Sequence, residues 1–149
     1  MMLAGAPSLS DFAARVIADL APKWNGSDAV DPAIFEEAAG FGLFGAELPR
    51  EAGGLGLDFL ARTKLFATLA AVDFGFAMSV VNTHNVALNL VRIGTEKQRA
   101  IYLPRMLAGQ MSACTALTEP VAGTDFSAIA TTAQQDGPDW VLNGEKSWI

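Results

Sequence analysis

Residues 117–125 read LTEPVAGTD. The sequence pattern changes near this stretch, from helical periodicity before it to strand-like segments after it. Thr118 places a hydroxyl and an amide at the end of a predicted strand. Gly123 allows either a positive φ or the close approach of a ligand. Thr124 and Asp125 can either face a ligand or bond their own backbone in a self-contained turn. Taken alone, the stretch favours the self-contained turn.

A second informative segment covers residues 143–149 and reads NGEKSWI. Its Asn-Gly pair, Asn143-Gly144, predicts a hairpin turn, and residues 145–149 predict the returning strand. Trp148 can stack beside a flat conjugated ring, or it can anchor a core or an interface, which is the commoner fate of tryptophan. Further strands are expected at 112–118, 130–135 and 140–142, with a turn over 136–139.

Before residue 110 the apolar spacing predicts helices. The first has Ser8 and Asp11 as a capping pair and carries a stripe of Phe12, Val16, Ile17 and Leu20. The second begins with Asp31 as N-cap and Pro32 as first helical residue, and its end is loosened by glycines. The remaining three are expected over about 59–71 after Asp58, over 74–93, and from Thr95, with Gln98 closing a capping box, to about 107.

Two features of this helical region constrain its packing. The helix over 74–93 is apolar all round and is therefore expected to be the central, most buried one. It carries His84, the only histidine, which we interpret as a core or interface residue, because no Cys, His, Asp or Glu cluster has metal-ligand spacing. Residues 48–56 read LPREAGGLG and predict a loop with tight backbone contacts.

Composition excludes several functions. The 149 residues are 51% hydrophobic and 17% charged, which is typical of a chain that forms a core. A net charge of −6 argues against nucleic-acid binding. Cys114 is the only cysteine, which excludes an internal disulfide and predicts a reducing, cytoplasmic location. No secretory signal or membrane span is expected, since the most apolar stretch, 74–91, carries four strongly polar side chains.

The segments 117–125 and 143–149, about 20 residues apart, together resemble the acyl-CoA dehydrogenase family. The family also has an LPxExGGxG loop, here residues 48–56, and a helix reading GTExQRxxYLPxMxxG, here residues 94–109. The resemblance extends over about residues 9–149. It implies a mainly α fold: an N-terminal bundle of about five helices over residues 1–110, then the first strands of an incomplete β-barrel domain over 111–149.

The resemblance also implies chemistry. Family members use FAD to oxidise the α,β bond of an acyl-CoA thioester to the enoyl-CoA. A glutamate, usually in a C-terminal helical domain, removes the α-proton, and the flavin takes the β-hydrogen as hydride. Electrons then pass to an electron-transferring flavoprotein, and FAD in these enzymes also contacts a neighbouring subunit, which implies a homo-oligomer.

Carried over residue by residue, the cofactor-binding residues are Leu117, Thr118, Gly123, Thr124 and Trp148. Leu117 and Thr118 would contact the flavin ring, with the Thr118 hydroxyl bonding its polar edge, and Trp148 would flank the ring. Gly123 and Thr124 would lie near the FAD phosphates and the entry of the acyl-CoA, so that Thr124 also binds substrate.

No catalytic residue is expected in this chain. Glu119 lies in the motif, but its expected role is structural. Because hairpin arms need strand partners, we expect a fragment that alone binds FAD weakly or not at all. The alternatives are a non-enzymatic helical interaction or oligomerisation module, or an acyl-CoA oxidase or flavin monooxygenase of the same fold.

Overall fold

The computed structural model describes residues 12–14 and 31–149. The predicted first helix therefore lies outside the described residues except at residues 12–14, so that Phe12 is described but Ser8, Asp11, Val16, Ile17 and Leu20 are not. The chain divides into two compact units, Met1–Cys114 and Thr115–Ile149.

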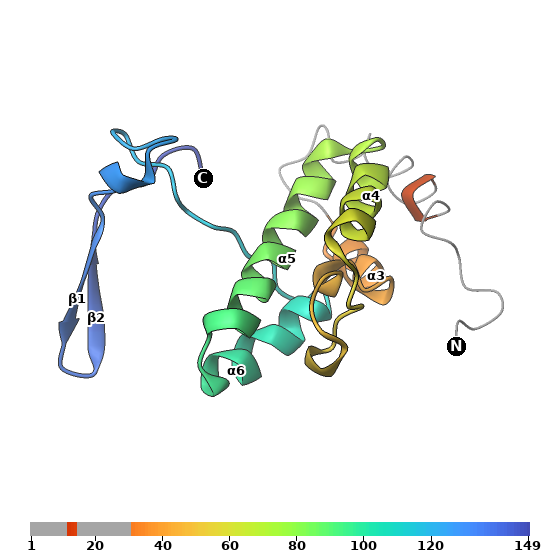
Figure 1. Ribbon diagram of the computed structural model, residues 1–149, viewed down its shortest axis with the longest axis horizontal. Coiled ribbons are helices and arrows are strands. Elements are labelled where there is room, and N and C mark those ends of the chain that lie inside the picture. Colours follow the sequence, from red (N-terminus) through yellow and green to blue (C-terminus); the bar gives the residue numbers. More distant parts are fainter. Residues whose placement is uncertain (1–11, 15–30) are drawn as a thin grey trace. The chain divides into compact units, whose positions relative to one another are not determined.

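The first unit is helical, as predicted (Figure 1). Its described helices are α3 (Ala33–Gly40), α4 (Phe59–Ala70), α5 (Phe74–Ile93) and α6 (Glu96–Leu107), and two 3-10 turns, Leu43–Gly45 and Arg50–Ala52, lie between α3 and α4. Local capping explains where these helices start. The Asp58 carboxylate accepts from the Ala61 N–H at 2.7 Å, and Thr95 and Gln98 form the predicted capping box. At α3 the helix begins one residue later than expected, with Pro32 at the N-cap position.

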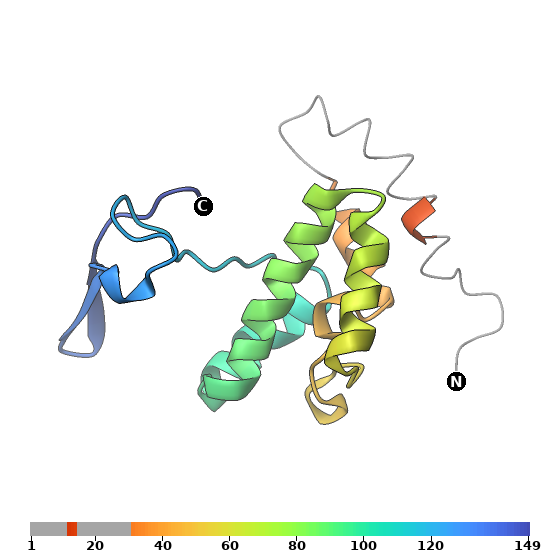
Figure 2. The same cartoon turned by 45° about the horizontal axis from the view of Figure 1, so that its top comes forward.

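Helix α5 has the central place predicted for it, because it packs against α4, α6 and the 3-10 turn Leu43–Gly45. Both views show α4 and α5 running side by side (Figure 1, Figure 2). Among the described helices α5 also has the most buried residues, as predicted, but it is not buried on every face. Its buried residues form one stripe, while Phe74 at one end is 69% exposed and Ile93 at the other is 84% exposed. The stripe consists of Phe76, Ala77, Val80, Thr83, His84 and Ala87.

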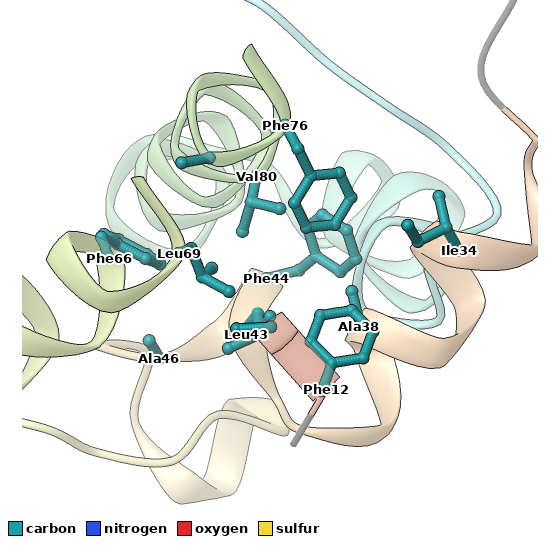
Figure 3. Packing of buried hydrophobic residues seen from close by; sticks show 12 residues of the cluster. Phe12, Ile34, Ala38, Leu43, Phe44, Ala46, Phe66, Leu69, Phe76 and Val80 are labelled. Carbon is teal, nitrogen blue, oxygen red and sulfur yellow. The ribbon is translucent and has the colours of Figure 1, made fainter. Parts of the chain in front are cut away.

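Apolar side chains from the helices and turns meet in a core cluster (Figure 3). Its large fully buried members include Phe44, Leu43 and Leu69, each of which contributes about 1.5–3 kcal/mol by leaving water. A second cluster, formed by Leu48, Ala87, Leu103 and Met106, joins α5 to α6. The first unit is therefore held together mainly by buried apolar surface.

The loop over 48–56 makes the tight backbone contacts that its glycines predict. The Gly56 N–H donates to the Leu48 carbonyl at 2.9 Å, and Leu48 is completely buried. A Cβ on Gly54 would lie 2.1 Å from the Leu48 carbonyl oxygen, so only glycine fits at that position.

The second unit contains an antiparallel hairpin, β1 (Thr132–Asp136) and β2 (Asp139–Asn143), in which Gln134 lies opposite Val141. The predicted turn over 136–139 is confirmed, with Gly137 at φ 59°. Every residue of both strands is exposed.

Two strand predictions and one turn prediction near this hairpin are wrong. Residues 112–118 form no strand, because no neighbouring strand in the described residues forms a ladder with them. Asn143-Gly144 is not a hairpin turn, because no strand follows it, and the backbone at Gly144 instead runs close to Thr131. Residues 145–149 form no returning strand.

None of the helices in the described ranges combines the length and apolar character needed to cross a bilayer.

Candidate functional site

The two motif segments lie side by side in the second unit. The Ser147 N–H donates to the Thr118 carbonyl at 2.9 Å, and Lys146 Nζ donates to the Leu117 carbonyl at 3.1 Å. These bonds join residues that are 29 positions apart in the sequence. The segment after Asn143 thus returns to the 117–125 loop without forming a regular strand.

Glu119 is the buried polar centre of this unit. Its Oε2 accepts from the Ala130 N–H at 2.7 Å, and its Oε1 accepts from the Thr131 N–H at 3.1 Å and from the Thr131 hydroxyl. Lys146 Nζ completes the set at 2.9 Å from Oε1. The Thr131 hydroxyl, the Lys146 ammonium and the Ala130 amide lower the pKa of Glu119 to about 2. Glu119 is therefore ionised at neutral pH and has the structural role predicted for it.

The loop after Glu119 is partly self-contained. Residues 119 and 122 exchange backbone hydrogen bonds of 2.9 and 3.2 Å, and Ala122 is buried. The Asp125 carboxylate accepts from the N–H and the hydroxyl of Ser127 at 3.0 and 2.5 Å, and both donors lower its pKa. Asp125 thus follows the self-contained alternative, as the cap of the 3-10 turn Phe126–Ala128.

Gly123 and Thr124 differ from Asp125. Gly123 does not take a positive φ, and a Cβ built on it meets no atom within 4 Å. Thr124 is exposed, and among the described residues its hydroxyl has no hydrogen-bond partner. No contact with the described residues requires glycine at 123, and the backbone there leaves room for the approach of another molecule.

Leu117 and Trp148 present apolar surface beside this loop. Leu117 is 42% exposed and Trp148 is 95% exposed, so Trp148 is not a core residue of its own unit. Within the described ranges Trp148 is the only non-glycine residue with a positive φ, at 61°. This conformation costs about 1–2 kcal/mol for an L-residue.

A shallow hollow of about 260 Å³ lies beside Glu119. Its walls are formed by Glu119, Pro120, Val121, Ala130, Thr131, Gly144 and Glu145. None of the five predicted cofactor-binding residues is among them, so the hollow does not coincide with the predicted site.

His84, in the first unit, is a satisfied core residue, as predicted. It is completely buried, and its Nε2 accepts from the Glu47 N–H at 3.2 Å. The proton therefore lies on Nδ1, which contacts Asn85 Oδ1 at 3.4 Å. Burial lowers the pKa of His84, so the ring is neutral. In the part of the chain that the structure describes, no group of three His, Cys, Asp or Glu side chains could hold a metal ion.

Sequence reasoning missed Lys146. It lies two residues before Trp148 and donates to both Glu119 and the Leu117 carbonyl, although the family resemblance assigned it no role. The only signal for this ion pair was Glu119 itself, because a glutamate that becomes buried needs a cation. The sequence contains several lysines and does not indicate which of them is the partner.

Comparisons with known proteins agree with the two-part organisation. The sequence matches the family model of the acyl-CoA dehydrogenase N-terminal domain over residues 6–110, and that of the acyl-CoA dehydrogenase middle domain over residues 114–149. The mitochondrial isobutyryl-CoA dehydrogenase of Dictyostelium discoideum is 33% identical over 140 residues, which is 93% of this chain and 33% of that protein.

Two solved structures are similar in both fold and sequence. A glutaryl-CoA dehydrogenase from Mycobacterium smegmatis, in complex with FADH2, has a TM-score of 0.85 and 29% identity over 94% of this chain and 36% of its own. A structure described as the electron transferring flavoprotein of Acidaminococcus fermentans has a TM-score of 0.78 and 30% identity over 96% of this chain and 40% of its own. The chain thus spans about a third of the length of the curated relative it matches.

Proposed function

The chain belongs to the acyl-CoA dehydrogenase family, and on that premise we propose that it supplies the flavin-cradling part of an FAD-dependent acyl-CoA dehydrogenase. The observation that carries the proposal is the joining of the two motif segments by the bond from the Ser147 N–H to the Thr118 carbonyl. This bond brings residues 117–118 and 148 into one local structure. The glutaryl-CoA dehydrogenase of similar fold holds FADH2, which supports FAD as the cofactor.

Each predicted residue has a role in this proposal. Leu117 and Thr118 contact the flavin ring, and the Thr118 hydroxyl bonds its polar edge. Trp148 flanks the ring, and its 95% exposure leaves its face available for stacking.

The phosphate end involves the loop after Glu119. Gly123 and Thr124 lie near the FAD phosphates, and Thr124 also contacts the entering acyl-CoA. The open space at Gly123 and the unpartnered hydroxyl of Thr124 within the described residues support these roles.

Bound FAD would accept the hydride that leaves the β-carbon of the acyl chain. The residues of this chain bind and orient the ring. We assign no catalytic base among them, because the carboxylate of Glu119, the glutamate of the motif, is buried and already accepts from four donors.

We extend the proposal to the organisation and partners of the protein. Residues 1–110 form the helical domain and residues 111–149 begin the β domain. An electron-transferring flavoprotein accepts the electrons, the protein is a homo-oligomer, and the lone Cys114 supports a cytoplasmic location. The Dictyostelium relative is named as mitochondrial, and cell fractionation distinguishes the two compartments.

The test uses the polypeptide encoded by the complete reading frame. We expect it to purify with FAD near one per chain, and we expect anaerobic addition of short, branched or medium acyl-CoA to bleach the flavin and give the enoyl-CoA by mass spectrometry. Absence of flavin would contradict the proposal and favour the helical interaction module. Flavin that reacts directly with O2 during acyl-CoA turnover would favour an oxidase.

A further inference from the structure

One carboxylate ties together three segments that are distant in sequence. Glu119 belongs to the motif loop, Ala130 and Thr131 precede β1, and Lys146 follows β2. All of these bonds end on the two oxygens of Glu119, whose side chain is 3% exposed. A buried carboxylate requires such compensation, because an unpaired charge away from water is costly.

Lys146 extends this network to the predicted flavin contacts. Its Nζ donates both to Glu119 Oε1 at 2.9 Å and to the Leu117 carbonyl at 3.1 Å. The next residue, Ser147, donates its N–H to the Thr118 carbonyl at 2.9 Å. The carbonyls of both predicted ring-contacting residues are therefore held by consecutive residues of the other segment.

Buried apolar contacts are sparse among the described residues of this unit. Both strands of the hairpin are exposed along their whole length, and Trp148 and Leu117 are exposed as well. Among the described residues of the second unit, Ala122 is the only buried apolar side chain. The contacts that join the two flavin segments are therefore mainly the polar ones around Glu119 and Lys146.

We propose that Glu119 and Lys146 form a positioning pair for the flavin site. Neither touches the cofactor. The pair fixes the backbone of Leu117 and Thr118 against Ser147, and this sets the Thr118 hydroxyl relative to Trp148. The inference rests on the proposed function, since it concerns the same site. Displacing a ligand-contacting group by about 1 Å in such a site strongly lowers the binding or the reaction rate that the site supports.

The experiment compares variants of Lys146 in the polypeptide from the complete reading frame. Lys146→Met keeps the length of the side chain and removes its charge and donors, whereas Lys146→Arg restores both. Lys97→Met, on the exposed side of α6, is the matched control. Stripped protein is titrated with FAD, and its dissociation constant and visible absorbance band are recorded. Hydrogen exchange at Ala130 and Thr131 checks that the Glu119 bonds persist.

We expect Lys146→Met to weaken FAD binding about ten- to a hundred-fold, by analogy with the loss caused by mutating the residues that orient metal ligands. The visible absorbance band of FAD bound to Lys146→Met should also shift. Lys146→Arg should restore both the affinity and the position of the band. Lys97→Met should have the affinity and the band of the parent protein. If Lys146→Met loses the amide protection, the same titration on Lys146→Gln decides, because its shorter, uncharged amide cannot replace the ion pair with Glu119 and should still weaken FAD binding.

Parent-like affinity in Lys146→Met, or in Lys146→Gln where that variant decides, overturns the positioning role while leaving the proposed function intact. Failure of the parent protein to bind FAD overturns the proposed function, and this inference with it.

Discussion

The two units of the chain are held together by different forces. In the helical unit the core is formed by many apolar side chains, such as Phe44, Leu69 and Val80, each completely or almost completely buried. In the unit beginning at Thr115 the strands are exposed, and the buried centre is the Glu119 carboxylate. The buried contacts of the first unit are therefore spread over many apolar side chains, whereas in the second the buried polar contacts converge on one ionised group. The stability of the two units should therefore respond differently to the shortening of a buried side chain and to acid.

The largest effect is expected from the helical core. Phe44→Ala removes a ring that is 2% exposed and should lower the free energy of unfolding by about 3–5 kcal/mol. Phe74→Ala, at a side chain that is 69% exposed, is the control and should change it by less than about 0.5 kcal/mol. Urea unfolding followed by helical circular dichroism measures both. Equal effects would show that the core is not where the structure places it.

Acid should act next, on the second unit. The pKa of Glu119 is about 2 in the folded chain, below its ordinary value of 4.5, so its stabilisation is complete above pH 4.5 and is lost as the pH falls toward 2. Amide protection at Ala130 and Thr131, corrected for intrinsic exchange rates, should fall over this window. Glu119→Gln should have weaker protection and no such window. Protection in the parent that persists unchanged to pH 2 would refute the network.

A smaller pH effect is expected in the helical unit, at higher pH. Burial lowers the pKa of His84 below 6.5, so the unfolded chain binds the proton more readily and stability falls as the pH drops below 6.5. One proton gives a slope of at most about 1.4 kcal/mol per pH unit. His84→Gln should flatten the dependence of the urea midpoint between pH 7 and about 5. The same slope in both proteins would assign the effect to another group.

The smallest effect concerns a single helix cap. Asp58→Ala removes the acceptor for the Ala61 N–H and should cost about 1 kcal/mol. Asp58→Asn keeps an acceptor oxygen and should stay close to the parent. Thermal unfolding in parallel provides the measurement, and a loss from Asp58→Asn as large as that from Asp58→Ala would show that the charge, and not the hydrogen bond, matters.

The same contrast explains what the sequence could predict. The bounds of α5 and α6 follow from local signals, namely the caps Asp73 and Thr95 and the glycine after α5, so they could be read from neighbouring residues. The turn over 136–139 could be read from its residues, but the second predicted turn, Asn143-Gly144, does not form, since residues 145–149 pair with no strand in the described residues.

For the candidate site, the motif residues were predictable from the family resemblance, but the network that joins them was not. The bond between Lys146 and Glu119 links residues 27 positions apart, and the residues next to either one do not indicate its partner. Asp125, by contrast, bonds Ser127 two residues away, and its self-contained turn was among the predicted outcomes.

The spacing of the Glu119 contacts also bears on the order in which a growing chain can fold. All the described contacts of the helical core are complete once residue 113 has been synthesised. Glu119 then gains its partners in sequence: residues 130 and 131 follow it by 11 and 12 positions, and Lys146 by 27. Because N-terminal parts fold first during synthesis, the helical unit can form on the ribosome while the carboxylate still lacks its cation.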